Sequence, residues 1–532
     1  MNLLDHLIMA PILIPLLAGA LLVGIEEQWR RRKVSIALGA ALLSWLSAMV
    51  LLWQADQMPG GVPAMTYLVG NWKVPFGIAL VVDRLSALML VLAGGIFSAA
   101  LLYSVARWDR VGVHFYALSL FLIAGVNGAF LTHDLFNLFV FFEVMLAASY
   151  GLLLHGSGKR RVRHGLRYVA MNLAASSVFL IGVALLYAAT GSLNMSDVAS
   201  KVGQMSATDR HLLETGAAIL AVAFLLKAAV WPLNLWLPGS YGAATPPVAA
   251  MFAIMTKVGL YVVMRLWLLM FSDEAGVSAG FGGNALLWIG LATLAVATFG
   301  LLSAADFRRF AGFSVVASSG TLLAGLALRT EVATTATLYY MLASTLAIGA
   351  FFLLIELLER IRDFGANLLA VTQEAFEAEG MVLPEGEDVG VVIPAAFAFL
   401  GLNFILCALV LSGLPPLASF VGKFALMAAM LETPDVGQWV FLTLLIVSGL
   451  AAVVALMRLG IRLFWVPAHL RRPRLRVIEA APVAALLVAC LGLTVAAGPV
   501  GSYLARTAAG LYQVDDLMQS VVGQQPWRGE QP

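Results

Sequence analysis

Four ionisable side chains lie deep inside long apolar stretches of the sequence: Glu143, Lys227, Lys257 and Lys423. A charge near the middle of a bilayer opposes insertion by about 2.5–3.5 kcal/mol even on a lenient scale, so these four need pairing or hydration. One carboxylate could clamp one lysine, but that structural interpretation leaves two lysines unexplained. Because burial and nearby charges readily change the protonation of such groups, their pattern favours a path for protons or other ions.

Prolines interrupt two of the apolar segments that carry these lysines. They are Pro232 and Pro238 after Lys227, and Pro415 and Pro416 before Lys423. Proline has no amide hydrogen and opposes a straight helix. Broken helices at membrane depth are tolerated where they are buried in protein or line a watery cavity, and in transporters they often mark the ion site. The sequence therefore predicts two broken helices, each beside a buried lysine.

The elements that position these side chains are predicted to be membrane helices. The 532 residues are 61% hydrophobic and 12% charged, with a mean hydropathy of +0.92, whereas soluble domains are far more charged. The apolar runs have the length of membrane helices rather than of barrel strands. We predict an all-α polytopic membrane protein with about fourteen transmembrane helices, near residues 7–25, 34–53, 81–105, 112–131, 134–154, 167–189, 214–237, 245–270, 285–303, 312–328, 334–357, 394–429, 438–463 and 479–498.

Basic residues are divided unequally between the two sets of loops that these spans create. If the N-terminus is outside, the inner loops carry lysine or arginine at 21 positions: 30–33, 107, 110, 159–161, 163, 167, 308, 309, 360, 362, 458, 462, 471, 472, 474 and 476. The outer loops carry them at six: 73, 201, 210, 329, 506 and 528. Because basic loops stay on the cytoplasmic side, we predict that both termini lie outside.

Two interrupted segments in comparable places predict two inverted five-helix repeats, an arrangement found in many transporters. Helices 1–3 occupy residues 1–111, and the first repeat, helices 4–8, occupies 112–270. The second repeat, helices 9–13, occupies 271–465 and includes an acidic cytoplasmic loop at 361–393. The last helix and a polar tail occupy 466–532.

Other classes of function lack their sequence signatures. The basic runs flank apolar spans, so we assign them to topology and lipid headgroups rather than to nucleic acid. Cys407 and Cys490 have no metal or redox spacing, and we find no metal-ligand cluster, phosphate loop or cofactor motif. His133 and Asp134 are the nearest approach to an enzyme constellation, but they lie at a helix end, where a cap is expected. We therefore predict neither an enzyme nor a bound metal or cofactor.

Several segments resemble the proton-pumping antiporter family, over most of the chain. They are "VDRLSALML", "NLFVFFEVMLAASYGLLL", "LLKAAVWPLNLWLP", "TPPVAAMFAIMTKVGLY", "ADFRRFAGFSVVASSG" and "GLPPLASFVGKFALM". This family includes subunits of Mrp/Pha-type cation/proton antiporters and membrane subunits of respiratory complex I. The resemblance implies that Glu143 and Lys227 form an input pair, that Lys257 is the central relay, and that Lys423 is the terminal proton site.

The sequence departs from many relatives in two places. Asn234 stands where they have histidine, and the segment "YYMLASTLAIGAFF" has no histidine. Water with Ser344, Thr345 or Tyr340 could form the relay there, or those polar groups could serve helix packing alone. The early glutamate and the lysine after "GLPP" are similar to the D subunit of the antiporters and also to the largest pump subunit of complex I. The chain length favours the D subunit, and so does the acidic loop, which resembles that of the Pha-type branch.

The resemblance implies a secondary-transporter subunit that moves protons through a Glu/Lys relay in a multisubunit Na⁺ or K⁺/H⁺ antiporter. The alternative is a proton-pumping membrane subunit of complex I or of a membrane-bound hydrogenase. The expected partners are other subunits of a hetero-oligomeric complex, protons, Na⁺ or K⁺, and the lipid bilayer. The expected location is a bacterial inner membrane.

Overall fold

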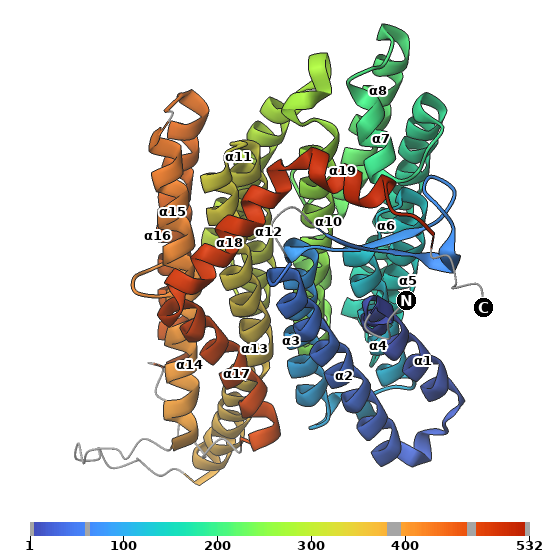
Figure 1. Ribbon diagram of the computed structural model, residues 1–532. Coiled ribbons are helices and arrows are strands. Elements are labelled where there is room, and N and C mark those ends of the chain that lie inside the picture. The colour runs from blue at the N-terminus through green and yellow to red at the C-terminus, as the bar shows by residue number, and fades with distance from the viewer. Residues whose placement is uncertain (1–4, 59–63, 380–394, 433, 465–474, 527–532) are drawn as a thin grey trace.

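Helices make up nearly all of the protein. The computed structural model describes residues 5–58, 64–379, 395–432, 434–464 and 475–526, with the backbone alone for residues 361–379 (Figure 1). Two short strands, β1 (Met65–Leu68) and β2 (Ala79–Val82), pair antiparallel between the second and third helices. These features confirm the predicted all-α class.

The helices of the first part of the chain are α1 (Ala10–Gly24), α2 (Arg30–Asp56), α3 (Arg84–Ser104), α4 (Phe115–Leu131), α5 (Leu135–Leu154), α6 (Lys159–Thr190), α7 (Met195–Val202), α8 (Ala207–Lys227), α9 (Leu237–Ala243) and α10 (Pro246–Met270). Those of the second part are α11 (Gly283–Ser303), α12 (Phe307–Ala327), α13 (Glu331–Glu379), α14 (Ala395–Ser412), α15 (Ala418–Glu432), α16 (Val436–Phe464), α17 (Val477–Val495), α18 (Ala497–Tyr512) and α19 (Val514–Val522). Short 3₁₀ turns occupy Asp5–Met9, Glu27–Trp29, Val69–Asn71, Trp108–Arg110 and Asp273–Ser278.

Twelve helices within the described ranges are long and apolar enough to cross a membrane. Every predicted span also contains helix, including α4, which has 17 residues, and α8, which carries more charge. The number of crossings, fourteen, and the inverted repeats stay predictions.

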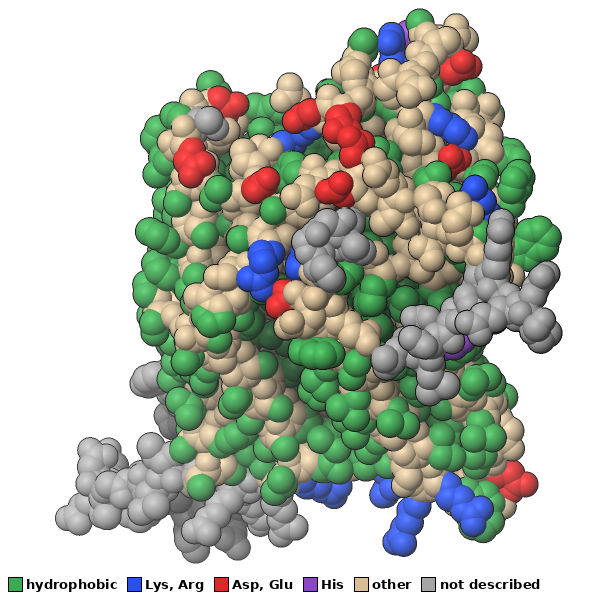
Figure 2. Space-filling model, in the orientation of Figure 1, with side chains coloured by type: hydrophobic (Ala, Val, Ile, Leu, Met, Phe, Trp, Pro, Cys, Tyr) green, Lys and Arg blue, Asp and Glu red, His purple; other side chains and the backbone are tan. Residues whose placement is uncertain are grey.

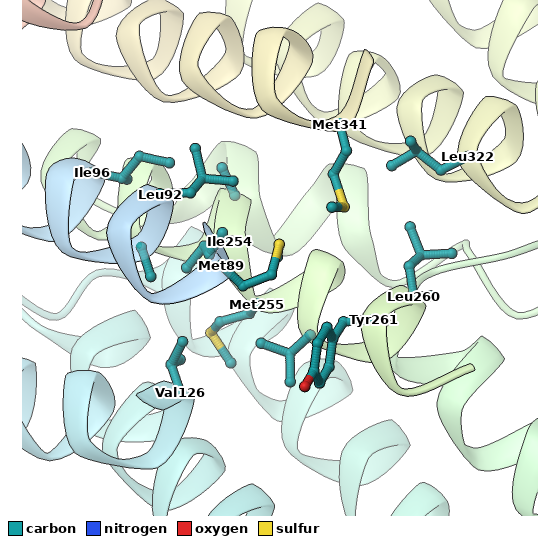
Figure 3. Close-up of a cluster of buried hydrophobic side chains, with 14 of the residues drawn as sticks. Met89, Leu92, Ile96, Val126, Ile254, Met255, Leu260, Tyr261, Leu322 and Met341 are labelled. Carbon is teal, nitrogen blue, oxygen red and sulfur yellow. The ribbon is translucent and has the colours of Figure 1, made fainter. Parts of the chain in front are cut away.

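Helix α10 lies at the centre of the bundle. All of its residues are buried, and it packs against α3, α4, α8, α12 and α13. Figure 3 shows the apolar cluster on this helix, to which α3, α4, α12 and α13 contribute. The labelled side chains are Met89, Leu92, Ile96, Val126, Ile254, Met255, Leu260, Tyr261, Leu322 and Met341. A side chain on α10 is therefore shielded from lipid by the surrounding helices.

Two helices are broken where the prolines predicted it. Helix α8 ends at Lys227, and the chain is not α-helical again until Leu237. Pro232 lies inside this gap, but Pro238 lies in the first turn of α9, where a missing amide hydrogen is harmless, so it begins a helix rather than breaking one. Pro415 and Pro416 both lie between α14 and α15.

The two broken helices have equivalent surroundings. Helices α8 and α9 both pack against α6 and α10, the neighbouring long helices in the chain. Helices α14 and α15 likewise both pack against α13 and α16. Each broken pair thus follows the course of a single interrupted helix between its two sequence neighbours, and this placement is consistent with the predicted repeats.

Basic side chains gather at one end of the bundle, which we call the basic end. The loops between α1 and α2 and between α3 and α4 meet there, where Arg30 binds Asp109. Arg308 and Arg360 pair with Glu359 and Glu356 at the same end. Figure 2 shows Lys and Arg side chains along the lower edge and most Asp and Glu side chains in the upper half. We call the upper end the acidic end.

Two regions differ from the predicted organisation. The tail after residue 498 includes the helices α18 and α19, which run across the bundle near the acidic end and contact α13, α10 and α7 (Figure 1). The polar side chains of the tail lie on these two amphipathic helices, which composition alone did not reveal. The predicted acidic loop begins too early, because α13 continues to Glu379; residues 380–393 of that loop lie outside the described residues.

Candidate functional site

Glu143 lies on α5, nine residues beyond the cap that starts the helix. The Asp134 carboxylate accepts a hydrogen bond of 2.8 Å from the Asn137 amide and fixes that start. Nine residues of helix rise about 13 Å, close to half the hydrocarbon thickness. The half-buried Glu143 accepts a 2.5 Å hydrogen bond from the Ser176 hydroxyl on α6. The carboxylate is therefore tied to the next helix.

Lys227 is the last residue of α8, and its side chain points into the protein. It is 5% exposed, and its Nζ has no hydrogen-bond partner among the described residues. The ammonium lies 4.9 Å from the ring centre of Phe142, the residue next to Glu143. The structure thus places the two predicted partners in one neighbourhood but does not join them by a hydrogen bond.

The break after Lys227 is held by side chains as well as backbone. The Trp231 amide donates to the Thr293 hydroxyl at 3.0 Å, and the Trp236 indole donates to the Leu226 carbonyl at 3.3 Å. Asn234, in place of the expected histidine, is 1% exposed, and its Oδ1 has no partner in the described part of the chain. Lys227 Nζ and Asn234 Oδ1 are thus two buried polar atoms at this break that water could hydrogen-bond.

Lys257 lies near the middle of α10 and is completely buried. Its Nζ donates a 2.8 Å hydrogen bond to the Ser318 hydroxyl on α12. Ser318 is in turn 3.0 Å from the Ser344 hydroxyl on α13. The two serine hydroxyls therefore extend a line of polar groups from Lys257 across α12 to α13.

A small cavity extends this polar line to the second broken helix. It has a volume of about 20 Å³, which is room for one water molecule. Its polar lining comprises Ser314, Thr321, Tyr340, Ser344, Ser419, Lys423 and Ser448. The buried Ser419 hydroxyl has no partner among the described residues, so a water here would find hydrogen-bond partners. Lys257 and Lys423 are thus linked through two hydroxyls and a polar cavity.

Lys423 lies on α15 and is 6% exposed. Its Nζ donates a 2.9 Å hydrogen bond to the carbonyl oxygen of Ser412, the last residue of α14. A cation is favoured there because the unpaired carbonyls at a helix C-terminus carry partial negative charge. Gly413 lets the lysine approach, since a Cβ at that position would lie 2.6 Å from Lys423 Cδ.

The structure distinguishes among the polar residues that the sequence suggested as relay groups by their contacts. Ser344 and Tyr340 line the cavity, whereas the Thr345 hydroxyl donates to the carbonyl of Met341 on its own helix. Sequence reasoning missed Ser318, which sits in "VVASSG". Two adjacent serines in an apolar run were the available signal, but serine is common inside membrane helices. Only the fold shows which one faces Lys257.

The nearest enzyme-like pair has a structural geometry. His133 lies between α4 and α5, and its Nε2 is 2.8 Å from the Ser196 hydroxyl. Burial lowers the pKa of His133 to about 3, so the ring is neutral. Asp134 caps α5 as described above. Within the described ranges no group of three or more His, Cys, Asp or Glu residues could hold a metal ion.

Comparisons with known proteins converge on one family. Residues 132–451 match the family described as NADH:quinone oxidoreductase/Mrp antiporter, TM. The chain is similar to the D subunit of a probable K(+)/H(+) antiporter from Rhizobium meliloti (strain 1021), with 52% identity over 97% of this chain and 96% of that protein. It is 33% identical to the D subunit of the Na(+)/H(+) antiporter from Alkalihalophilus pseudofirmus over 87% of both chains. A chain in the solved Mrp complex from Dietzia sp. DQ12-45-1b superimposes with a TM-score of 0.84 at 25% identity, over 98% of this chain and all of that one.

Proposed function

Because the chain belongs to the NADH:quinone oxidoreductase/Mrp antiporter membrane family, we propose that it moves protons as one component of a multisubunit K⁺/H⁺ or Na⁺/H⁺ antiporter. The observation that carries this proposal is the continuous line from Lys257 through Ser318 and Ser344 to the cavity beside Lys423. A line of groups that both donate and accept hydrogen bonds can pass protons between two buried amines.

In this proposal Glu143 and Lys227 supply protons to the relay. Lys227 is a buried amine without a hydrogen-bond partner in the described part of the chain, so its charge depends on the Glu143 carboxylate and on water. Helix α8 packs against α10, which brings its broken end towards the helix of Lys257. A proton would pass from Glu143 and Lys227 to Lys257 and then laterally to Lys423.

The terminal role falls to Lys423. Its ammonium is held by one backbone carbonyl and faces a cavity that admits water, with no carboxylate in hydrogen-bonding contact among the described residues. Such an amine can lose its proton without leaving a buried carboxylate unpaired. Proton loss there would weaken the hydrogen bond to the Ser412 carbonyl, because a neutral amine is a poorer donor than an ammonium, and would couple the charge to the position of the broken helix.

In this proposal, the identity of the exchanged cation and its route across the membrane are set by the whole complex and not by this chain alone. The buried groups of the relay are mainly cationic, which suits protons rather than coordination of Na⁺ or K⁺. Further subunits of the complex are the proposed partners, in a bacterial inner membrane. The relative with 52% identity bears the name of an antiporter component, which favours exchange over the alternative of a redox-driven pump.

The test is cation-dependent proton movement in everted vesicles from cells that lack their own antiporters and express the complete set of subunits. Addition of K⁺ or Na⁺ should dissipate a preformed proton gradient without NADH or quinone. Lys227→Ala and Lys257→Ala should each abolish this exchange while the complex still assembles on a blue-native gel. Lys201→Ala, at a half-exposed lysine paired with Asp197 outside the relay, is the matched control.

Near-normal exchange in either relay variant would reject that lysine's role. Loss of assembly would show that the lysine is a structural clamp instead. Proton movement that requires a redox substrate and ignores both cations would favour the complex I-like alternative.

A further inference from the structure

A buried ion pair joins Arg265 on α10 to Asp83, the residue that caps α3, between Lys257 and the acidic end of the bundle. Arg265 donates from Nη1 and Nη2 to the two carboxylate oxygens of Asp83 at 2.7 and 2.8 Å. Its Nη2 also donates to the Tyr261 hydroxyl at 3.1 Å. Arg265 is 5% exposed and Asp83 8% exposed. The proposed relay makes no use of this pair.

The pair occupies the face of α10 that carries Lys257. Lys257, Tyr261 and Arg265 are spaced four residues apart, so they lie along one side of the helix. Arg265 is displaced by about 12 Å from Lys257 along the axis. Asp83 caps α3 directly after β2, at the end opposite Arg107 and Arg110. This face is therefore a polar line from the relay towards the acidic end.

None of the groups on this line is arranged to pass a proton. A relay group must accept one proton and donate another. The Tyr261 hydroxyl donates to the Phe130 carbonyl at 2.7 Å. A backbone carbonyl has no proton of its own to donate, so a proton cannot be passed on from there. Arginine stays protonated in proteins, so Arg265 accepts nothing. Asp83 is held by both Arg265 contacts and by the Ser86 amide at 2.8 Å.

Other titratable groups near the pair are also engaged. His133 is bound to the Ser196 hydroxyl. Tyr503 on α18 donates to the Arg84 carbonyl at 2.8 Å. Neither is hydrogen-bonded to Arg265 in the described part of the structure.

We infer that Arg265, held by Asp83 and Tyr261, is a proton barrier that closes the acidic end of the first half of the protein. A proton on Lys257 is then kept from the acidic end, and its onward route is towards Ser318 and Lys423. Leakage across the membrane through the first half would dissipate the gradient without exchange, and the barrier prevents it. This inference rests on the proposed function and assigns a role to a residue outside the relay.

The critical variant is Arg265→Lys. Lysine keeps the positive charge beside Asp83 but can release its proton, so it turns the barrier into a relay group. The purified complex is reconstituted in liposomes with N-methylglucamine as the only other cation, and proton entry after an acid pulse is followed with an internal dye. We expect entry several-fold faster than in the wild type. Arg308→Lys, in the Arg308–Glu359 pair at the basic end, should leave entry unchanged.

A second substitution identifies the path of the leak. Lys257→Met added to Arg265→Lys should return proton entry to the wild-type rate. If the lysine variant does not assemble, Arg265→His supplies another titratable group at the same position. The inference would be overturned if an assembled Arg265→Lys or Arg265→His variant admitted protons no faster than the wild type. It would also be overturned if the faster proton entry persisted after Lys257→Met. Since no exchangeable cation is present, this result is independent of the antiport measurement that tests the proposed function.

Discussion

The ammonium of Lys423 on α15 is hydrogen-bonded at 2.9 Å to the carbonyl of Ser412, the residue that ends α14. One broken helix therefore supplies both the buried cation and the negative end that stabilises it. The contact links the protonation state of Lys423 to the relative positions of α14 and α15. Deprotonation of Lys423 would weaken this contact, because the charge that strengthens it is lost.

Lys423→Arg should be nearly as inactive as Lys423→Ala in cation-dependent proton movement. Arginine keeps the charge but resists deprotonation, and its larger head must fit beside Gly413. Both variants are measured in the same vesicles, with assembly checked by blue-native gel. Substantial rescue by arginine would mean that Lys423 acts only as a fixed positive charge.

Ser318→Ala should slow antiport, because it removes the hydroxyl that accepts from Lys257. A hydrogen bond to a charged group contributes about 1.5–3 kcal/mol, so a rate loss of roughly tenfold or more is expected. Ser318→Thr restores a hydroxyl and should recover much of the rate. Ser177→Ala, at an exposed helix serine that bonds only its own backbone, is the control. Equal rates for Ser318→Ala and the wild type would remove this serine from the relay.

Gly413→Ala should impair transport more than assembly. Gly413 has φ of 76°, and a methyl group there would lie within 2.6 Å of Lys423 Cδ. An ordinary residue in this left-handed conformation costs about 1–2 kcal/mol, and the lysine must also move away from Ser412. Gly492→Ala on α17, where a Cβ meets nothing within 4 Å, should behave as the wild type. Thermal stability of the purified complex and antiport are compared for both, and unchanged antiport in Gly413→Ala would contradict the prediction.

The orientation in the membrane is testable with single cysteines in a background of Cys407→Ala and Cys490→Ala, which removes both native free thiols. Ser157→Cys lies in the loop between α5 and α6 at the basic end, and Ser200→Cys lies on α7. Both positions are exposed. In intact cells an impermeant thiol reagent should label position 200 and spare position 157. The reverse pattern would invert the predicted topology.

The sequence by itself determined the membrane class, the places of the long apolar helices and the presence of four charged residues within them. The free energies of placing apolar runs and charges in a membrane are large, so each of these features can be recognised from the local sequence alone. The same holds for Pro232, Pro415 and Pro416, because the missing amide hydrogen acts locally. Pro238 was misassigned because proline is also favourable at the start of a helix.

Only the tertiary structure decided which weakly polar groups face one another. Ser318 and Ser344 are 26 residues apart, and Asp83 and Arg265 are 182 apart. A serine inside a membrane helix looks the same in sequence whether it packs, bonds its own backbone or meets a lysine. Arg265, near a helix end, resembles an ordinary interfacial charge. Helix packing sets the rotation of each helix about its axis, and that rotation decides which residues form the proposed relay and the proposed barrier.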